Sequence, residues 1–594
     1  MKSSRTRRTE GVRRAGALAL AFACAACANA ERHAPPGLTA DATAPRPGPA
    51  VFAEDAGGGA FDPGDSGAAA AEDAFAGPLS GPFHDFPSSP LLDMPDAGSA
   101  PSNAAQLFGP PSQGSAAGGP CLVEPEVGAL YPNNWLRPRF AWTTPNSEDL
   151  FELRVHVDNQ ADDLVVYTPA TQWTMPQSMW TALAAHSQDV PMTVAVRGGL
   201  VENGQLTSEA LGSSGPIGIA PASAPGTIVY WAIVNGAQTG VLKGFAIGDE
   251  GVASVLTPSQ VEERGAGGVP CIGCHASTPD GANVGFSIGY DEGSPGAYTD
   301  GIATIGKTAT PGLVPSFLTP DAKRTMDGLG GIPAYSPSHW KAGDRVVLLS
   351  DTGDLHWVNL EATGAQVTGV VARGPADSRL ATDPSWSRDG TTIVYTSAGS
   401  VYNGRQQGSP MDLYAVPYAG GDGGVASPIA GASQANVDEY YPALSPDDQY
   451  VVFNGAPAGD NPYSDPRAEL FVVPRSGAPG GVPVRLNAND PPACTGEKSP
   501  GVTNSWAKWS PTAQPVAVLG RTYYWVVFSS TRYPSGPAQD SPQLYVTAVV
   551  VDARGAMTTY PALYLWNQPA TEHNHTPAWD VFLIPPPPPP PITR

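Results

Sequence analysis

The amino-acid sequence predicts an all-β protein in which a small β-sandwich precedes a larger domain built from repeated sheets. Three observations support this fold class. Only 15% of the 594 residues are charged, whereas Gly (68) and Pro (65) are frequent, and this balance is typical of loop-rich β proteins. Short segments that alternate apolar and polar residues run through most of the chain. From residue 225 onward, a short turn sequence recurs ahead of such segments.

The chain begins with a secretory signal, which we expect to span residues 1–30. The first fourteen residues contain six basic side chains, and the apolar run 15–26 that follows is too short to cross a membrane. The small residues at 28–30 fit a cleavage site that would release a soluble product. The alternative is lipidation of Cys24 or Cys27, which would tether the protein to a membrane. Both readings predict export, to the periplasm or the outer-membrane surface.

Two segments have compositions that do not favour a folded core. Residues 31–118 consist mainly of Ala, Gly, Pro, Asp and Ser. They bury too little apolar surface to offset the entropy cost of ordering, so we expect a disordered stalk. Residues 585–594 begin with a run of prolines and predict a short polyproline tail.

Residues 119–222 predict a small antiparallel sandwich. Turn residues separate short alternating strands, which are expected at 140–142, 151–157, 164–167 and 190–196. The pattern resembles an immunoglobulin or fibronectin type III module. We expect the tryptophans of this segment to pack in its core rather than to bind carbohydrate. These residues are Trp135, Trp142, Trp173 and Trp180.

Residues 225–584 consist of repeated units. Each unit opens with a W-S-x-D-G or S-P-D type of turn, found at Tyr335, Trp386, Leu444 and Trp509. Each opener leads into a β-rich run, at 346–350, 393–397, 450–453 and 525–529. A further strand of shared type follows, at 355–358, 413–416, 470–473 and 544–546.

The P-x-W-S-x-D-G opener resembles the TolB-type, WD40-like β-propeller repeat. Two more openers, at 277–281 and 577–582, bring the number of units to six. The last opener has no room for further strands, so we expect 228–231 and 242–247 to complete its sheet. Pairing the two ends of the domain closes the ring and removes exposed sheet edges. The resemblance therefore implies a six-bladed propeller.

The most specific motif is Cys271-Ile272-Gly273-Cys274-His275, in a chain with six cysteines and nine histidines. Covalent attachment of haem c needs two thiols and an imidazole at this spacing. Cys271 and Cys274 would form the thioethers, and His275 would be the proximal iron ligand. A disulfide or redox pair between the two cysteines remains the alternative. A zinc site is disfavoured because no second ligand pair accompanies the motif.

Alignment of the repeats places His275 at the position of Pro384, near the mouth of a central channel. The neighbouring units would bring Met326 and His575 to the same place, and either could be the sixth iron ligand. Other residues expected near this mouth are Glu439, Tyr440, Tyr441, Asn504 and Trp506.

The remaining cysteines and the net charge limit the partners. After removal of the signal, Cys121 and Cys494 are left, and an oxidising compartment favours a disulfide between them. The formal net charge of −23 argues against nucleic acid as a partner. We expect a redox protein or an envelope protein as partner, and membrane contact only through a lipid anchor.

Taken together, these features favour an exported c-type cytochrome that transfers electrons through one haem on a propeller. Two alternatives stay open. One is a haem enzyme with an open sixth position, and the other is a non-haem binding propeller with Cys271 and Cys274 as a disulfide. Electron transfer or binding is favoured over catalysis, because the sequence lacks a G-x-S-x-G elbow, an H-E-x-x-H motif and a phosphate-binding loop.

Overall fold

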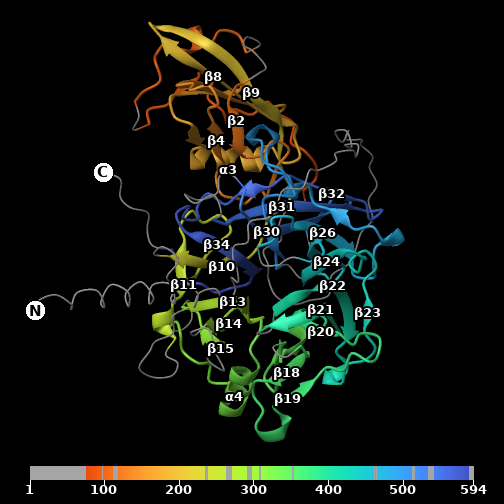
Figure 1. Cartoon of the computed structure of the whole chain (residues 1–594). Helices are drawn as coiled ribbons and strands as arrows, with labels where there is room; N and C mark the ends of the chain where they lie inside the picture. Colours follow the sequence, from red (N-terminus) through yellow and green to blue (C-terminus); the bar gives the residue numbers. More distant parts are fainter. Residues whose placement is uncertain are drawn as a thin grey trace, which may run out of the picture.

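The protein consists of a β-sandwich joined to a ring of β-sheets (Figure 1). The structure, a computed structural model, describes residues 75–95, 98–111, 118–234, 239–261, 271–289, 298–306, 310–350, 353–402, 405–459, 462, 464–511, 516–532 and 541–587. The predicted all-β class is confirmed. The signal, Cys24 and Cys27, stalk residues 31–74 and tail residues 588–594 lie outside the described ranges. Within those ranges, no helix is long and apolar enough to cross a membrane.

The sandwich has two sheets and a helix, α3 (Gln177–His186). One sheet has the strand order β1-β6-β5-β8-β9-β3, and the other has the order β2-β4-β7. Their bounds are β1 (Leu91–Leu92), β2 (Cys121–Glu124), β3 (Leu130–Tyr131), β4 (Arg139–Thr143), β5 (Leu150–Val157), β6 (Leu164–Thr168), β7 (Gln172–Thr174), β8 (Met192–Glu202) and β9 (Gln205–Ile219). The strands are mostly antiparallel, as predicted for this segment, but β1 pairs parallel with β6 and β3 pairs parallel with β9.

All four tryptophans of this segment lie in the sandwich core, as predicted. Trp173 is the most exposed of them, at 8%. The Trp180 indole N–H donates to the Trp135 carbonyl at 2.9 Å, so its polar atom is satisfied inside the core. The same apolar cluster continues into the ring of sheets, where it includes Trp525 and Tyr230. The two units therefore share one core.

The prediction of a disordered stalk reaching residue 118 is wrong for residues 75–95 and 98–111. This segment contains β1, which pairs parallel with β6, and the short helix α2 (Ala104–Phe108). Phe108 is fully buried. The buried Arg197 guanidinium donates to the carbonyls of Phe108, Gly109 and Pro110 at 3.0–3.1 Å. A buried cation thus binds the end of this segment, and Ala104 and Phe108 pack in an apolar cluster with Tyr167.

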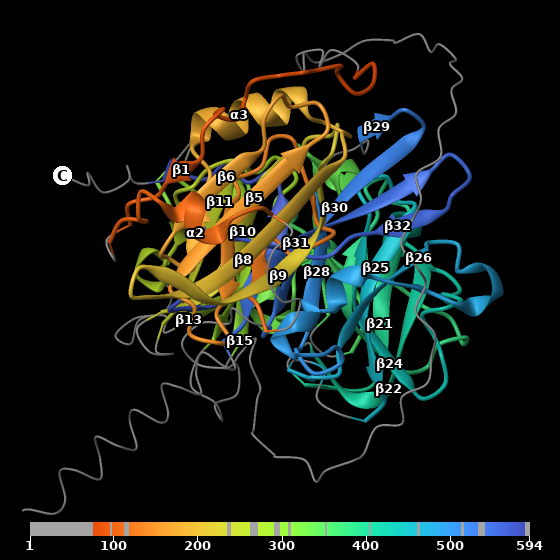
Figure 2. The ribbon, with the colours of Figure 1, turned by 90° about the horizontal axis from the view of Figure 1, so that it is seen from above.

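The C-terminal unit is a β-propeller, in which successive sheets are arranged in a ring (Figures 1 and 2). Residues from these sheets line a central cavity. Four sheets in the described residues follow one another along the chain. They comprise β16 (Trp340–Lys341), β17 (Asp344–Leu349), β18 (His356–Asn359) and β19 (Thr368–Val370); β20 (Leu380–Trp386), β21 (Thr392–Tyr402), β22 (Arg405–Pro417) and β23 (Ser427–Pro428); β24 (Val437–Leu444), β25 (Tyr450–Pro457), β26 (Glu469–Pro474) and β27 (Val484–Arg485); and β28 (Ser505–Trp509), β29 (Val516–Val518), β30 (Arg521–Ser530), β31 (Gln543–Asp552), β32 (Met557–Thr559) and β33 (Leu563–Tyr564).

The remaining propeller strands form one larger sheet of order β15-β14-β13-β11-β10-β34, with β12 beside β11. Their bounds are β10 (Thr227–Val234), β11 (Thr239–Ala246), β12 (Ala253–Leu256), β13 (Cys271–Ser277), β14 (Asn283–Gly289), β15 (Tyr298–Thr304) and β34 (His573–Asp580). Helix α4 (Pro320–Leu329) follows β15. Short 3₁₀ helices lie in the connections, namely η2 (Pro258–Gln260), η3 (Pro337–His339), η4 (Gly364–Gln366), η5 (Ala419–Gly421), η6 (Pro479–Gly481), η7 (Asn487–Asn489) and η8 (Ala493–Thr495).

The repeated openers form tight turns between the first and second strands of a sheet. The Ser387 hydroxyl donates to Asp389 Oδ1 at 2.6 Å, and the same oxygen accepts the Thr391 N–H at 2.9 Å. Gly390 follows with φ +74°, a conformation that disfavours side chains. The hydroxyl-to-carboxylate bond recurs in two other units, from Ser445 to Asp447 and from Thr278 to Asp280. Local hydrogen bonding therefore explains why the repeat is visible in the sequence.

The two ends of the propeller domain pair, as predicted. Strand β34 lies antiparallel to β10, with His575 opposite Trp231 and Ala578 opposite Val229. Since β34 also lines the central cavity, the C-terminal strand is the innermost one of a sheet that the first propeller strands continue. The ring is thus closed by backbone hydrogen bonds between residues far apart in the sequence.

The predicted disulfide between Cys121 and Cys494 is present, with Cα atoms 5.6 Å apart. It links β2 of the sandwich to η8 of the propeller. The two units also meet at β30, where the Trp525 indole N–H donates to the Ser223 carbonyl at 3.1 Å and Arg521 pairs with Asp189. The sandwich is therefore fixed to the propeller covalently and by polar contacts.

Candidate functional site

The centre of the propeller holds a cavity of about 240 Å³. Chain segments from all around the ring line it, at 274–277, 332–335, 383–386, 441–446, 508–511 and 576–581. Each segment belongs to, or leads into, the innermost strand of a sheet. The predicted convergence of these segments on a central channel is therefore confirmed.

The innermost strands carry a β-bulge at equivalent positions. In β20, β24 and β28 the register shifts between Thr382 and Ser385, Tyr440 and Ala443, and Ser505 and Lys508. The first bulge residue has positive φ in several strands, at Asp383 (49°), Tyr441 (52°), Trp506 (59°) and Thr576 (43°). Such bulges bend a strand and redirect its side chains. In β13 the shift spans Gly273 to His275, so His275 occupies the place of Pro384, as the repeat alignment predicts.

His275 lines the cavity as a neutral imidazole. Its side chain is 7% exposed, and its Nε2–H donates to the Val229 carbonyl at 3.0 Å. Burial is the main cause that lowers the pKa of His275 to about 4, with the Lys508 charge acting in the same direction. Nδ1 therefore carries the lone pair, and it has no hydrogen-bond partner among the described residues.

The other residues predicted for a haem site do not gather around His275. His575 is buried, with its ring centroid 4.5 Å from that of Trp231, and it does not line the cavity. Burial lowers the pKa of His575 to about 3. Met326 is fully buried in α4, in an apolar cluster with Val347 and Val358. The structure thus brings neither candidate sixth ligand to the cavity.

The C-x-x-C-H segment fits a disulfide-braced strand better than a haem attachment site. A haem needs both sulfurs for thioethers and an imidazole nitrogen that reaches the iron. Cys274 is disulfide-bonded and 3% exposed in an apolar cluster with Phe286 and Phe582. The side chain of Cys271 lies outside the described residues. The unpartnered Nδ1 of His275 is the observation that agrees with a metal ligand, and haem c stays a prediction.

Metal chemistry of other kinds finds no support in the described ranges. No group of three or more His, Cys, Asp or Glu side chains there is placed to hold a metal ion.

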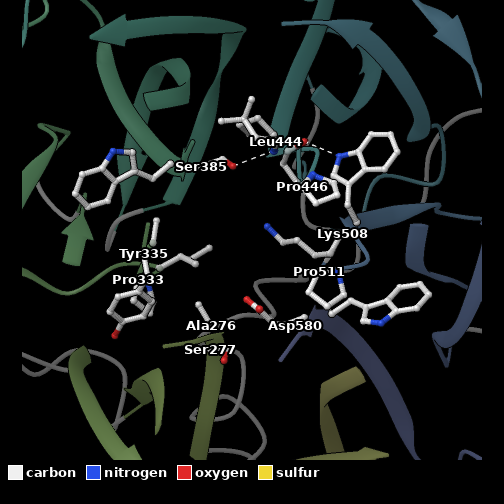
Figure 3. A pocket seen from close by; sticks show the side chains of 18 of the residues that line it. Ala276, Ser277, Pro333, Tyr335, Ser385, Leu444, Pro446, Lys508, Pro511 and Asp580 are labelled. Carbon is white, nitrogen blue, oxygen red and sulfur yellow. Dashed lines mark hydrogen bonds between the residues drawn. The ribbon is translucent and has the colours of Figure 1, made fainter. Parts of the chain in front are cut away.

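Charged groups enter the cavity from two sides. The Lys508 ammonium and the Asp580 carboxyl both extend into it (Figure 3). Lys508 is half-buried, and burial lowers its pKa, while the nearby Asp383 acts in the opposite direction. Burial raises the pKa of Asp580 to about 6, and the Val581 N–H and Arg388 oppose that shift. The cavity thus holds a basic and an acidic side chain, and neither belongs to the predicted site.

Aromatic rings form much of the remaining wall. The stacked pair Tyr441 and Trp506 has ring centroids 3.8 Å apart. Trp386, Trp509 and Trp579 also line the cavity, and their indole N–H groups donate to the carbonyls of Gly390, Ala443 and Pro225. The rings are thus held in place by the backbone, and most of their surface is buried in the apolar clusters of the propeller.

Sequence reasoning found part of this lining and missed its charges. Tyr441 and Trp506 line the cavity as expected, whereas Glu439, Tyr440 and Asn504 are fully buried elsewhere. Lys508 was detectable in principle, because it directly precedes the W-S-P opener in the place that Ser385 and Ala443 take in neighbouring units.

The propeller class rests on the sheet topology and the shared cavity, and known proteins add little. No protein-family model matches the chain, and no curated protein matches its sequence. Similar solved structures include a protein assigned as TolB from Agrobacterium tumefaciens, at 16% identity over 41% of this chain and 87% of that chain, with a TM-score of 0.16. A puromycin hydrolase is 13% identical over 63% of this chain and 52% of its own length (TM-score 0.26), and a thermostable family-43 glycoside hydrolase is 10% identical over 62% and 88% (TM-score 0.28). Because these TM-scores are low, the activities of these proteins are not assigned to this chain.

Proposed function

We propose that the protein is a binding propeller that holds a small ligand in its central cavity. The observation that carries this proposal is the cavity itself, which combines fixed aromatic walls with charged side chains that extend into it. Ligand sites in proteins typically combine an apolar wall with a few placed polar groups. The Ser445 hydroxyl in the lining donates to Asp447, but this pair belongs to the turn that recurs in other units, so we favour binding over catalysis.

The proposal includes a six-bladed, TolB-like architecture, because six chain segments converge on the cavity. It also includes export to the periplasm or the outer-membrane surface, which rests on the N-terminal sequence and on the use of cysteines in disulfides. An envelope protein is the proposed partner of the exported form.

A cavity-filling variant tests this function. Ala443→Phe would place a ring in the cavity, whereas Val425→Phe adds a ring at an exposed position outside it and serves as the matched control. We expect at least one compound from a library of organic acids, amino acids, amines and sugars to raise the Tm of the wild type and of Val425→Phe, but not of a folded Ala443→Phe. If the same compounds stabilise all three proteins equally, the central cavity is not the binding site.

A second candidate function is electron transfer by a haem c on Cys271, Cys274 and His275. The observation that favours it is the unpartnered Nδ1 of His275 within the C-x-x-C-H motif. The visible spectrum of protein exported from a host with c-type maturation machinery tests it. Sharp reduced bands that survive acid–acetone extraction support covalent haem, and a colourless protein without free thiols excludes it and supports the disulfide.

A further inference from the structure

We infer that the ligand of the central cavity carries a carboxylate and that Lys508 is its counter-ion. This inference rests on the proposed binding function and names the chemical class of the ligand. It depends on where Lys508 lies in the ring, on the groups that neutralise the other charges, and on the room left around the ammonium.

Lys508 is the one large side chain in its layer of the cavity among the described residues. The equivalent positions around the cavity each pair with the second strand of their sheet, Ala334 through an isolated bridge to Leu348. They hold Ala276, Ala334, Ser385, Ala443, Lys508 and Ala578. The five small side chains leave space, and the lysine side chain extends into that space (Figure 3). The layer thus has the geometry of a pocket with one cation at its wall.

The Lys508 ammonium has no acidic side chain within salt-bridge distance in the part of the chain that the structure describes. The other acids near the cavity have different neighbours. The Asp448 carboxylate accepts hydrogen bonds from the backbone N–H groups of Arg388 and Asp389 at 2.8 and 3.1 Å. Asp580 lies in the field of Arg388 and accepts the Val581 N–H. The charge of Asp383 attracts Lys508 without a salt bridge between them among the described contacts.

A half-buried cation without a paired anion is unfavourable, because it has lost part of its hydration without a full replacement. A ligand carboxylate would supply that replacement through a charge-assisted hydrogen bond. The neighbouring His275 is neutral and adds no second positive charge. Arg388, the other basic side chain of the lining, lies in the field of Asp580. A single anionic group of carboxylate size therefore matches the one cation of this layer.

Calorimetric titration with defined probes tests the inference. The probes are acetate, propionate and lactate as carboxylates, propylamine as a cation and propanamide as a neutral analogue. The variants are Lys508→Met, which removes the charge, Lys508→Arg, which keeps it, and Lys341→Met, which removes an exposed lysine on β16 as the matched control. Thermal unfolding of each variant establishes that it folds.

We expect a carboxylate probe to bind the wild type, Lys341→Met and Lys508→Arg, and to bind Lys508→Met about tenfold or more weakly. Binding of propylamine or propanamide in preference to the carboxylates, with no effect of Lys508→Met, would overturn the carboxylate inference and leave the binding function intact. If no probe binds and the library also fails to stabilise the wild type, both the inference and the proposed function fail. If Lys508→Met does not fold, the salt dependence of carboxylate binding by the wild type is measured instead. Weaker binding at high salt supports the inference, and binding that does not change with salt contradicts it.

Discussion

At the scale of the residue, burial sets the charge state of several side chains far from solvent. Glu439 in β24 is fully buried, and one carboxyl oxygen accepts the Gln434 N–H at 3.1 Å. Burial, together with the charges of Asp412 and Asp438, raises the pKa of Glu439 to about 9. Its other oxygen has no hydrogen-bond partner among the described residues. Glu439 is therefore a neutral acid at neutral pH.

The raised pKa predicts a specific pH dependence of stability. Because the pKa of Glu439 is higher in the folded than in the unfolded protein, its contribution to stability is complete below about pH 4.5. That contribution is lost as the pH rises towards 9. Glu439→Gln mimics the protonated acid and removes this loss. We expect the fall in the free energy of unfolding between pH 5 and pH 8 to shrink by roughly 2–4 kcal/mol in Glu439→Gln. Urea denaturation at several pH values measures it.

The exposed Glu202, changed to Gln in the same way, is the matched control. If the free energy of unfolding changes with pH by the same amount in the wild type and in Glu439→Gln, Glu439 is not a neutral buried acid.

The two buried histidines, His275 and His575, give stability the opposite pH dependence, because their pKa values are lowered. The folded pKa values of His275 and His575, about 4 and about 3, lie below the ordinary value of 6.5. The unfolded chain therefore binds more protons between pH 6.5 and these values, and stability falls as the pH falls through that window. We expect His575→Gln to reduce the loss of unfolding free energy between pH 7 and pH 4, measured by urea denaturation. The half-exposed His186→Gln is the control, and equal losses in both variants would contradict the prediction.

At the scale of the element, the sandwich is held to the propeller by polar contacts of β30 and by a disulfide between β2 and η8. The Cys121–Cys494 disulfide spans a sequence separation of 373 residues. A cross-link of this span restricts the unfolded chain strongly, so its removal destabilises the folded state even when the folded contacts remain. The polar contacts of Arg521 and Trp525 act at the same junction.

We expect the double variant Cys121→Ser/Cys494→Ser to lose roughly 2–5 kcal/mol of unfolding free energy. Guanidinium denaturation under oxidising conditions measures the loss without affecting the disulfide of Cys274. Arg521→Ala, which removes a half-exposed ion pair at the same junction, should cost about 1 kcal/mol or less. A double variant as stable as the wild type would mean that the junction is held by packing alone.

At the scale of the whole molecule, closure of the ring depends on one strand from the C-terminal end. Strand β34 covers the inner edge of β10 and supplies residues 576–580 to the cavity. Its Trp579 belongs to the core cluster that the sandwich shares. Loss of this strand exposes a sheet edge and opens that core at once.

Truncation tests this dependence. We expect removal of residues 573–594 to abolish cooperative unfolding, whereas removal of residues 588–594 alone should leave the Tm unchanged. Far-UV circular dichroism and size-exclusion chromatography measure both. Partial rescue of the longer truncation by a peptide of residues 573–587 would show that the missing strand, rather than chain length, is the cause. A native-like Tm for the longer truncation would refute the closure.

The sequence by itself determined the features that depend on neighbouring residues or on repetition. Openers such as 387–390 are stabilised by bonds between residues two to four apart, so their composition reveals them. The closure of the ring was predicted because the last opener has no strands after it. The pairing of Cys121 with Cys494 was predicted because these two cysteines remain once the signal and the C-x-x-C-H motif are set aside.

Only the tertiary structure decided which distant side chains meet. Residues 108–110 are held by Arg197, which lies 87–89 positions further along the chain and binds their carbonyls, and Phe108 packs against Tyr167. Met326 lies in an apolar core rather than at the channel, because α4 turns it inward against β17 and β18. Lys508 became a candidate ligand group only when the ring placed it opposite five small residues, since no local pattern encodes the content of a cavity shared by six strands.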